Sequence, residues 1–192
     1  MSAKRIAIFA SGRGSNAKAI IDYFKNSDAI EVAVVLSNKP NAGVLETARE
    51  NGIPFMVVSR YEFYKNTENV VYALKEHGVD FIALAGFLWL IPNAIINSFP
   101  KNIVNIHPSL LPKFGGKGMH GQHVHSAVIE AGEVESGITI HYVNEVYDDG
   151  EVVLQERCPV LSTDTPSELA DRVLKLEHYH FPRVIERLLA DG

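Results

Sequence analysis

The amino-acid sequence predicts an α/β fold with a mostly parallel central sheet, helices on both faces and an antiparallel edge in the C-terminal half. Short apolar runs alternate with segments of helical spacing through the first half of the chain, which implies parallel strands joined by right-handed crossovers. A glycine-rich turn, 11–16, directly follows the first apolar run. Two later strand-like segments are separated only by an acidic loop, 144–150, which favours an antiparallel pair.

The first half contains apolar runs that are short enough for buried strands. These runs are Ile6–Ala10, Val32–Leu36, Pro54–Val58 and Phe81–Ala85. Apolar residues recur at helical spacing from Ala17 to Phe24, and glycine ends two further predicted helices, at Val44–Asn51 and at Val70–His77. Ligands of such sheets lie at the carboxyl ends of the strands, so the residues that follow each strand are the first candidates for a site.

The second half is less regular. The strands expected there are Ile103–Ile106, Gly137–Val143 and Glu151–Cys158, and a helix is expected at His123–Ala131. Thr165 and Pro166 supply an N-cap and a proline at the first helical position, so a last helix is predicted from there to Leu189, with a kink at Pro182. Because the chain has no repeat and no linker, we expect residues 1–192 to form a single domain.

Composition narrows the class of protein. Of the 192 residues, 46% are hydrophobic and 21% are charged, which is typical of a folded globular chain. The net charge of −5 argues against a general nucleic-acid binder. The single cysteine, Cys158, excludes an intrachain disulfide and a cysteine-rich zinc site. The first apolar run is too short for a signal peptide or a membrane span, so we expect a cytoplasmic protein that binds small molecules and contacts neither nucleic acid nor membrane.

The glycine-rich turn is the first candidate site. It consists of Gly12, Arg13, Gly14, Ser15 and Asn16. Glycines let backbone N–H groups approach an anion, and the helix N-terminus adds partial positive charge, so the turn predicts phosphate binding. The alternative is an ordinary tight turn between strand and helix. An NAD site would need an acidic residue after the second strand, and residues 37–39 contain none, which argues against NAD and leaves NADP open; the resemblance described below implies no NAD(P).

Asn105 and His107 form the second candidate site, at the end of the fifth strand. Alternation places both side chains on one face, while Ile106 enters the core. An amide and an imidazole can together stabilise an oxyanion and move a proton, although such a pair can also be an ordinary satisfied polar contact. In the acidic loop, either Asp148 or Asp149 can orient or charge His107, and the alternative is a solvated turn.

Three neighbouring histidines raise the question of a metal site: His120, His123 and His125. On a helix, the side chains of His123 and His125 diverge by roughly 200° instead of converging. No cysteine or carboxylate stands at a helpful spacing, so we expect no metal.

Together these segments resemble the folate-dependent phosphoribosylglycinamide formyltransferases, essentially over the whole chain. The resemblance rests on Ser11–Asn16, Leu84–Phe87, Asn105–Pro112, Gly137–His141, Asp148–Gly150 and Leu176–His178. It implies a Rossmann-like formyltransferase fold, with a ribonucleotide half, 1–100, and a catalytic and folate-binding half, 101–192. It also implies transfer of a formyl group from 10-formyltetrahydrofolate to the amine of glycinamide ribonucleotide in purine synthesis, by a monomer or a homodimer.

The resemblance also assigns roles. Asn105, His107 and Asp148 match the catalytic residues of the family, with Asp149 as the fallback and with Asp148 expected to hold His107 in its charged form. The glycine-rich turn matches the phosphate loop, and Glu177 matches an acid that binds the ribose. The pterin pocket is matched by Leu88, Trp89, Ile91, Val143, Asn144 and Asp148.

Three alternatives stay open at this point. A formyltetrahydrofolate hydrolase shares the Asn, His and Asp set but uses water, usually carries an extra N-terminal domain and needs no phosphate loop. A methionyl-tRNA formyltransferase is expected to carry a C-terminal tRNA-binding domain and basic charge. A non-catalytic dinucleotide-binding module would use only the glycine-rich turn, which leaves the polar residues after the fifth strand unexplained.

Overall fold

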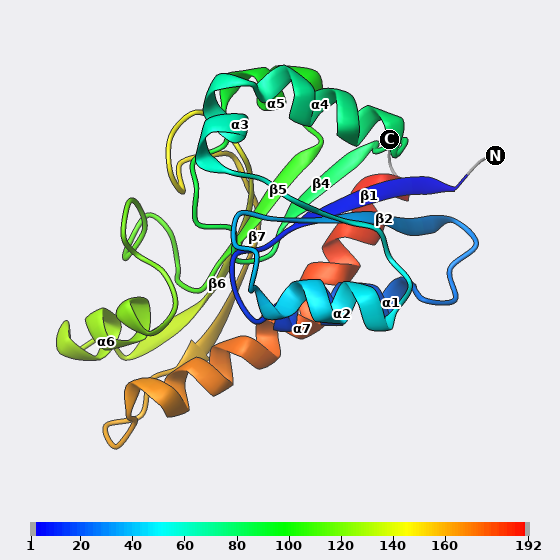
Figure 1. The fold of residues 1–192 in the computed structure, drawn as a ribbon. Coiled ribbons are helices and arrows are strands. Elements are labelled where there is room, and N and C mark those ends of the chain that lie inside the picture. Colours follow the sequence, from blue (N-terminus) through cyan, green and yellow to red (C-terminus); the bar gives the residue numbers. More distant parts are fainter. Residues whose placement is uncertain (1–2, 191–192) are drawn as a thin grey trace.

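Seven strands form one sheet in the computed structural model, which describes residues 3–190. The order across the sheet is β3-β2-β1-β4-β5-β6-β7 (Figure 1). The strands are β1 (Lys4–Phe9), β2 (Ile30–Ser37), β3 (Phe55–Val57), β4 (Phe81–Leu84), β5 (Ile103–His107), β6 (Glu135–Tyr142) and β7 (Val152–Pro159). The first five are parallel, β6 is antiparallel to β5, and β7 is antiparallel to β6. The predicted mostly parallel sheet with an antiparallel C-terminal edge is therefore confirmed.

Helices cover both faces of the sheet. They are α1 (Ser15–Phe24), α2 (Gly43–Glu50), α3 (Arg60–Lys65), α4 (Thr67–Glu76), α5 (Asn93–Ser98), α6 (Gln122–Glu130) and α7 (Pro166–Ala190). Helices α1, α2, α6 and α7 pack on one hydrophobic cluster, and α3, α4 and α5 pack on a second cluster across the sheet (Figure 1). Within residues 3–190, no helix combines the length and the hydropathy that a bilayer span requires.

The order in which strands are added to the sheet reverses after β3, although β1 and β4 are parallel. The chain moves outward from β1 to β3 and then returns to place β4 on the other side of β1. This switch opens the crevice beyond the carboxyl ends of the two strands, where ligands of such sheets bind. The segments beyond the strands are joined there, because the Ser11 N–H donates to the Gly86 carbonyl at 3.0 Å and the Leu88 N–H donates to Ser11 Oγ at 3.0 Å.

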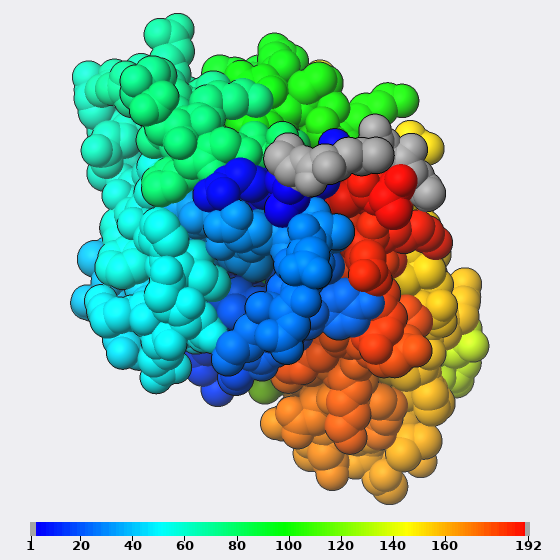
Figure 2. All heavy atoms as spheres, turned by 90° about the vertical axis from the view of Figure 1, so that its right-hand side faces the viewer, coloured from blue at the N-terminus to red at the C-terminus, as the bar shows by residue number. Residues whose placement is uncertain are grey.

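The last helix returns to the start of the chain. Thr165 and Glu168 cap α7 reciprocally, since each backbone N–H donates to the other side chain. The helix continues as one element through Pro182. It packs beside α1, and Figure 2 shows the blue N-terminal segments against the red and orange helix. The Tyr23 hydroxyl donates to Glu186 at 2.6 Å across this contact.

The sequence located every strand within a few residues, but it missed two helices. α3 begins at a capping box, in which Ser59 and Glu62 exchange hydrogen bonds, and this signature is readable in the sequence. α5 follows Pro92 and has only six residues, too few for a clear periodicity. β3 is shorter than predicted and lies at the sheet edge, where Phe55 is 41% exposed.

The β6–β7 hairpin has no room for a side chain at Gly137. A Cβ atom there would lie 1.9 Å from the Glu156 carbonyl oxygen and 2.8 Å from Leu110 Cδ2. We expect Gly137→Ala to force β6 and β7 apart and to lower the free energy of unfolding in urea by about 1–3 kcal/mol. Gly12→Ala is the control, because no atom lies within 4 Å of a Cβ built there. Equal stability of the two variants would contradict the close approach.

Candidate active site

Four polar side chains meet beyond the carboxyl end of β5. Asn105 and His107 come from β5, His141 from β6 and Asp148 from the loop between β6 and β7. Antiparallel pairing sets Asn105 directly opposite His141. Ile106, between the two β5 residues, packs into the core on the other face, as the sequence predicts. The strand register therefore gathers these polar groups on one face of the sheet.

Asp148 lies at the centre of this cluster. Its carboxylate accepts from Asn105 Nδ2 at 3.3 Å and from the Gly116 N–H at 2.8 Å. It also lies 3.4 Å from His107 Nδ1 and 3.6 Å from His141 Nε2. Asp149 is exposed and pairs instead with the Asn144 amide at 3.3 Å. Of the two candidate carboxylates, only that of Asp148 contacts the residues of β5.

The backbone fixes the tautomers of both histidines. His107 Nε2 lies 2.8 Å from the Phe114 carbonyl oxygen, and His141 Nδ1 lies 2.8 Å from the Tyr142 carbonyl oxygen. Because a carbonyl oxygen only accepts, each of these nitrogens carries a hydrogen. In the neutral rings, His107 Nδ1 and His141 Nε2 are therefore unprotonated. His141 Nε2 then accepts from Asn105 Nδ2 at 3.1 Å.

Burial and neighbouring charge oppose each other at this cluster. Burial lowers the pKa of His107. The Asp148 carboxylate and the Phe114 carbonyl raise this pKa, but they do not fully offset the effect of burial. Burial raises the pKa of Asp148, but the neighbouring His141 and His107 rings and the Gly116 N–H hold the pKa of Asp148 below its usual value. Asp148 thus favours the charged ring of His107 and burial opposes it, so the prediction that Asp148 holds His107 charged stays a prediction.

The predicted phosphate loop lies between β1 and α1. Gly14 has a φ of 81°, and a Cβ there would lie 2.6 Å from Val44 Cβ of α2, so only glycine lets the loop pack this closely. No side chain caps α1, whose first turn begins at Ser15 and contains no acidic residue. The first N–H groups of α1 therefore have no intrahelical partner and no side-chain cap, which is the arrangement that binds anions.

Glu177 of α7 lies beside this loop. Asn16 Nδ2 donates to its carboxylate at 2.8 Å, and the Glu177 residue is only 7% exposed. Burial raises the pKa of Glu177 to about 7, against the smaller lowering effect of the Asn16 hydrogen bond. The contact between α1 and α7 thus brings together two predicted substrate residues that lie far apart in the sequence.

The residues predicted for the pterin pocket lie on two segments beside the cluster. Leu88 is 36% exposed, whereas Ile91 is buried in the core beneath its segment. Trp89 packs against the rings of Phe63 and Phe87. Trp89 and Val143 lie on the same hydrophobic cluster, and Asn144 caps its own loop by accepting from the Val146 N–H at 2.9 Å. Their role in binding a pterin stays a prediction.

The histidines of the long loop do not converge on a metal site. Within residues 3–190, no group of three or more His, Cys, Asp or Glu side chains is arranged to hold a metal ion. His120 and His123 stack edge to face, and His125 is buried on α6.

His141 is the residue of this cluster that the sequence analysis missed. Alternation along 137–143 places Thr139, His141 and Val143 on one face, so the orientation of His141 was readable. What the sequence lacked was the register between β5 and β6, which brings His141 to Asn105.

The Asn, His and Asp cluster follows β5 and the uncapped N-terminus of α1 follows β1, so both lie at the carboxyl edge of a Rossmann-like sheet. The family model described as Formyl transferase matches residues 4–185, and the chain belongs to this family. Within it, the chain is 37% identical over 191 residues to the phosphoribosylglycinamide formyltransferase of Bacillus subtilis (strain 168), covering 97% of this chain and 95% of the relative.

Two further comparisons agree. The chain is 44% identical over 187 residues to a chloroplastic phosphoribosylglycinamide formyltransferase of Arabidopsis thaliana, covering 95% of this chain. It spans 64% of the length of that relative. The crystal structure of phosphoribosylglycinamide formyltransferase from Anaplasma phagocytophilum superposes with a TM-score of 0.88 at 35% identity, over 97% of this chain and 87% of that one. The predicted Rossmann-like formyltransferase fold is confirmed.

The buried carboxyl of Glu177 predicts a pH dependence of stability. Its pKa is raised from 4.5 to about 7 in the folded chain, so its stabilising effect is complete below about pH 4.5 and is lost as the pH rises through 7. We expect Glu177→Gln to remove this loss, which amounts to about 3 kcal/mol in unfolding free energy.

Urea unfolding at about pH 5 and about pH 8 measures the difference. Glu50→Gln, on the exposed surface of α2, is the matched control. If Glu177→Gln and Glu50→Gln follow the same pH dependence, the Glu177 carboxyl is not held protonated by burial.

Proposed function

We propose that this chain transfers the formyl group of 10-formyltetrahydrofolate to the amine of glycinamide ribonucleotide, N1-(5-phospho-D-ribosyl)glycinamide, in de novo purine synthesis. The observation that carries the proposal is the Asp148 cluster with Asn105 and His107, next to the uncapped N-terminus of α1. The names of the full-length bacterial relatives support the same reaction.

The cluster contains the groups that formyl transfer requires. The substrate amine attacks the formyl carbon and forms a tetrahedral intermediate with a negatively charged oxygen. The Asn105 amide turns one N–H from Asp148, 3.3 Å away in the free chain, to this oxygen, and the unprotonated Nδ1 of His107 accepts the proton that leaves the amine. Asp148, 3.4 Å from that nitrogen, stabilises the resulting imidazolium. The bond from carbon to N10 of the folate then breaks, and the same proton passes to the leaving nitrogen, directly or through water.

The pKa values suit this sequence of steps. A histidine whose pKa is lowered is mostly neutral near pH 7 and is therefore ready to accept a proton. The carboxylate of Asp148, whose pKa is also lowered, stays charged and favours the ring once it is protonated. His141 positions Asn105 through the contact between Asn105 Nδ2 and His141 Nε2, at 3.1 Å.

The ribonucleotide is assigned to the loop 12–16 at the start of α1 and to Glu177 of α7, which Asn16 contacts. Its phosphate binds the N–H groups of the loop 12–16, and Glu177 accepts from the ribose hydroxyls. Both substrates are anions and the chain has a net charge of −5, so binding depends on these local donors and not on the overall field. The folate is assigned to the segments that carry Trp89 and Val143.

The proposal needs two small molecules and no metal, nicotinamide cofactor, nucleic acid or membrane. It is compatible with a monomer or a homodimer, and we assign the reaction to the cytoplasm.

One assay separates this reaction from its nearest alternative. The chain is incubated with 10-formyltetrahydrofolate, with and without glycinamide ribonucleotide, and release of tetrahydrofolate is followed. We expect release only when the ribonucleotide is present. Deformylation at the same rate without the amine would instead identify a formyltetrahydrofolate hydrolase. A chain that binds a dinucleotide and releases no folate would be a binding module.

Two substitutions test the assigned catalytic residues. His107→Ala and Asp148→Asn should each lower kcat by about 10²–10⁴-fold, because each removes a group that handles the proton or its charge. Circular dichroism and urea unfolding check that each variant is folded. Asp149→Asn is the matched control, since Asp149 is exposed and lies outside the cluster, and it should keep kcat near that of the unchanged chain. A loss in Asp149→Asn with normal turnover in Asp148→Asn would reverse the assignment.

Ser15→Ala tests the phosphate loop. The Ser15 side chain is exposed at the first position of α1, so its loss should not disturb the fold. We expect the KM for glycinamide ribonucleotide to rise about tenfold, as for one hydrogen bond to a charged group, with little change in the KM for the folate. Ser162→Ala, in an exposed loop, serves as the control. Equal changes in both KM values would place the phosphate elsewhere.

A further inference from the structure

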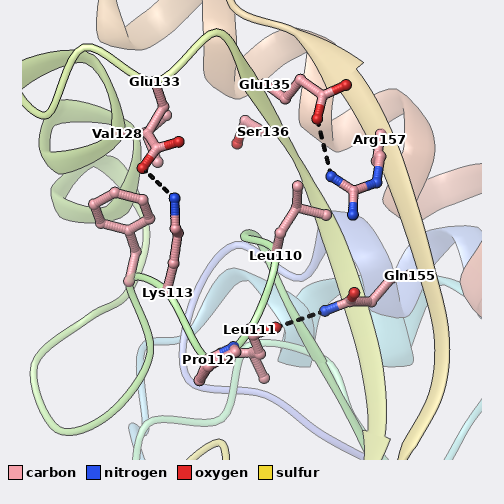
Figure 3. A pocket seen from close by; sticks show the side chains of 11 residues that line it. Leu110, Leu111, Pro112, Lys113, Val128, Glu133, Glu135, Ser136, Gln155 and Arg157 are labelled. Atoms are coloured by element: carbon pink, nitrogen blue, oxygen red, sulfur yellow. Dashed lines mark hydrogen bonds and ion pairs between the residues drawn. The ribbon is translucent and has the colours of Figure 1, made fainter.

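A cavity separate from the Asp148 cluster lies beside residues 110–114, the segment that follows β5. Its volume is about 260 Å³, and it is enclosed by residues 110–114, by α6 and by the ends of β6 and β7 that point away from the cluster (Figure 3). None of the residues assigned above to catalysis, to the ribonucleotide or to the folate lines it. Because ligand sites of drug-sized molecules begin at roughly 300 Å³, an occupant of this cavity has few heavy atoms.

Ser136 supplies an unpaired polar group in this cavity. The residue is 2% exposed, and its hydroxyl oxygen has no hydrogen-bond partner. Figure 3 shows its side chain between the two ion pairs of the cavity. Buried polar groups nearly always have a partner, because an unpaired one costs about 1–3 kcal/mol. A hydroxyl both donates and accepts, so it fits either end of a polar ligand.

Charges of both signs flank the mouth. Lys113 pairs with Glu133 at 2.7 Å on one side, and Arg157 pairs with Glu135 at 2.9 Å on the other (Figure 3). Each pair uses one carboxylate oxygen and one nitrogen, so further donors and acceptors remain on both sides. A ligand with a single charge would be attracted by one member of each ion pair and repelled by the other. A ligand with one ammonium and one carboxylate group can place its ammonium against a glutamate and its carboxylate against Lys113 or Arg157.

The remaining lining is apolar except for Gln155, whose Nε2 already donates to the Leu111 carbonyl and to Thr139 Oγ1. Leu110, Pro112 and Val128 contribute carbon surface, and Leu110 stands between the two ion pairs in Figure 3. We propose that this cavity binds a small zwitterionic amino acid with a short branched apolar side chain. The Ser136 hydroxyl and the two ion pairs bind the charged groups, and the apolar surface covers the side chain. The observations that support this site do not depend on the proposed transfer reaction.

The cavity shares a wall with the active site. The Thr139 hydroxyl donates to the Ser109 carbonyl at 2.7 Å and accepts from the Leu111 N–H at 3.0 Å, which fixes the start of the shared segment. The segment ends at Phe114, whose carbonyl accepts from His107 Nε2 at 2.8 Å. A ligand that packs on Leu110 therefore immobilises the residues that hold the His107 ring, and amide hydrogen exchange across 111–116 should slow when the site is occupied.

L-leucine and two analogues test the proposal with the full chain. 3-Methylbutylamine is leucine without its carboxylate, and 4-methylpentanoate is leucine without its ammonium group. Titrations followed by backbone amide NMR should give saturable shifts at Ser136, Leu110 and Val128 with leucine. Each analogue should bind about tenfold more weakly or worse, because each lacks one charge-assisted contact.

Ser136→Ala should weaken leucine binding about tenfold, and Ser162→Ala, at an exposed serine outside the cavity, should leave it unchanged. Arg157→Gln removes one charge of the ion pair with Glu135 while Ser136 is unchanged, and it should also weaken leucine binding. The proposal is overturned if leucine gives no saturable shift at these residues, if an analogue binds as well as leucine, or if Ser136→Ala and Arg157→Gln both bind leucine normally. Binding without slower exchange at 111–116 would overturn the link to His107.

Discussion

The buried carboxylate of Asp148 is the interaction on which the proposed active site depends. Taking a carboxylate out of water is costly unless donors replace the lost solvation. The Asn105 amide and the Gly116 N–H provide that compensation. These donors come from β5 and from the long loop after β5, so two distant segments must be in place before the charge can be buried.

The backbone conformation at Asp148 and Gly150 turns the Asp148 carboxylate into the cluster. Asp148 itself has a φ of 54°, in the left-handed region that Asp tolerates better than most residues. Two residues later, a Cβ at Gly150 would lie 1.7 Å from the Tyr142 carbonyl oxygen, so only glycine allows the loop to return to β7. The same Tyr142 carbonyl accepts from His141 Nδ1 and fixes the tautomer of that ring. Loop geometry and proton placement are thus determined together.

The sequence was sufficient for the parts of the molecule that depend on local pattern. Periodicity located the strands, and the order of strands and helices predicted the parallel sheet, because each crossover has one favoured hand. Alternation along β5 correctly separated Asn105 and His107 from Ile106. The fold and two of the four polar residues of the cluster could be found in this way.

What the sequence could not supply is registry between distant segments. His141 joins the cluster only through its pairing opposite Asn105, and the choice of Asp148 over Asp149 depends on which carboxylate the loop turns inward. The opposing effect of burial on the pKa of His107 was not predicted, because burial is a property of the packed site and cannot be read from neighbouring charges. The cavity behind residues 110–114 likewise exists only in the assembled fold.

The central claim is that His107 is a neutral ring with its hydrogen on Nε2, facing the Asp148 carboxylate through an unprotonated Nδ1. Nitrogen-15 NMR of the imidazole groups near pH 7, compared between the unchanged chain and Asp148→Asn, measures this directly. The account predicts a neutral His107 ring with the hydrogen on Nε2 and, for His141, the hydrogen on Nδ1. A hydrogen on Nδ1 of His107, or an imidazolium that persists in Asp148→Asn, would contradict it.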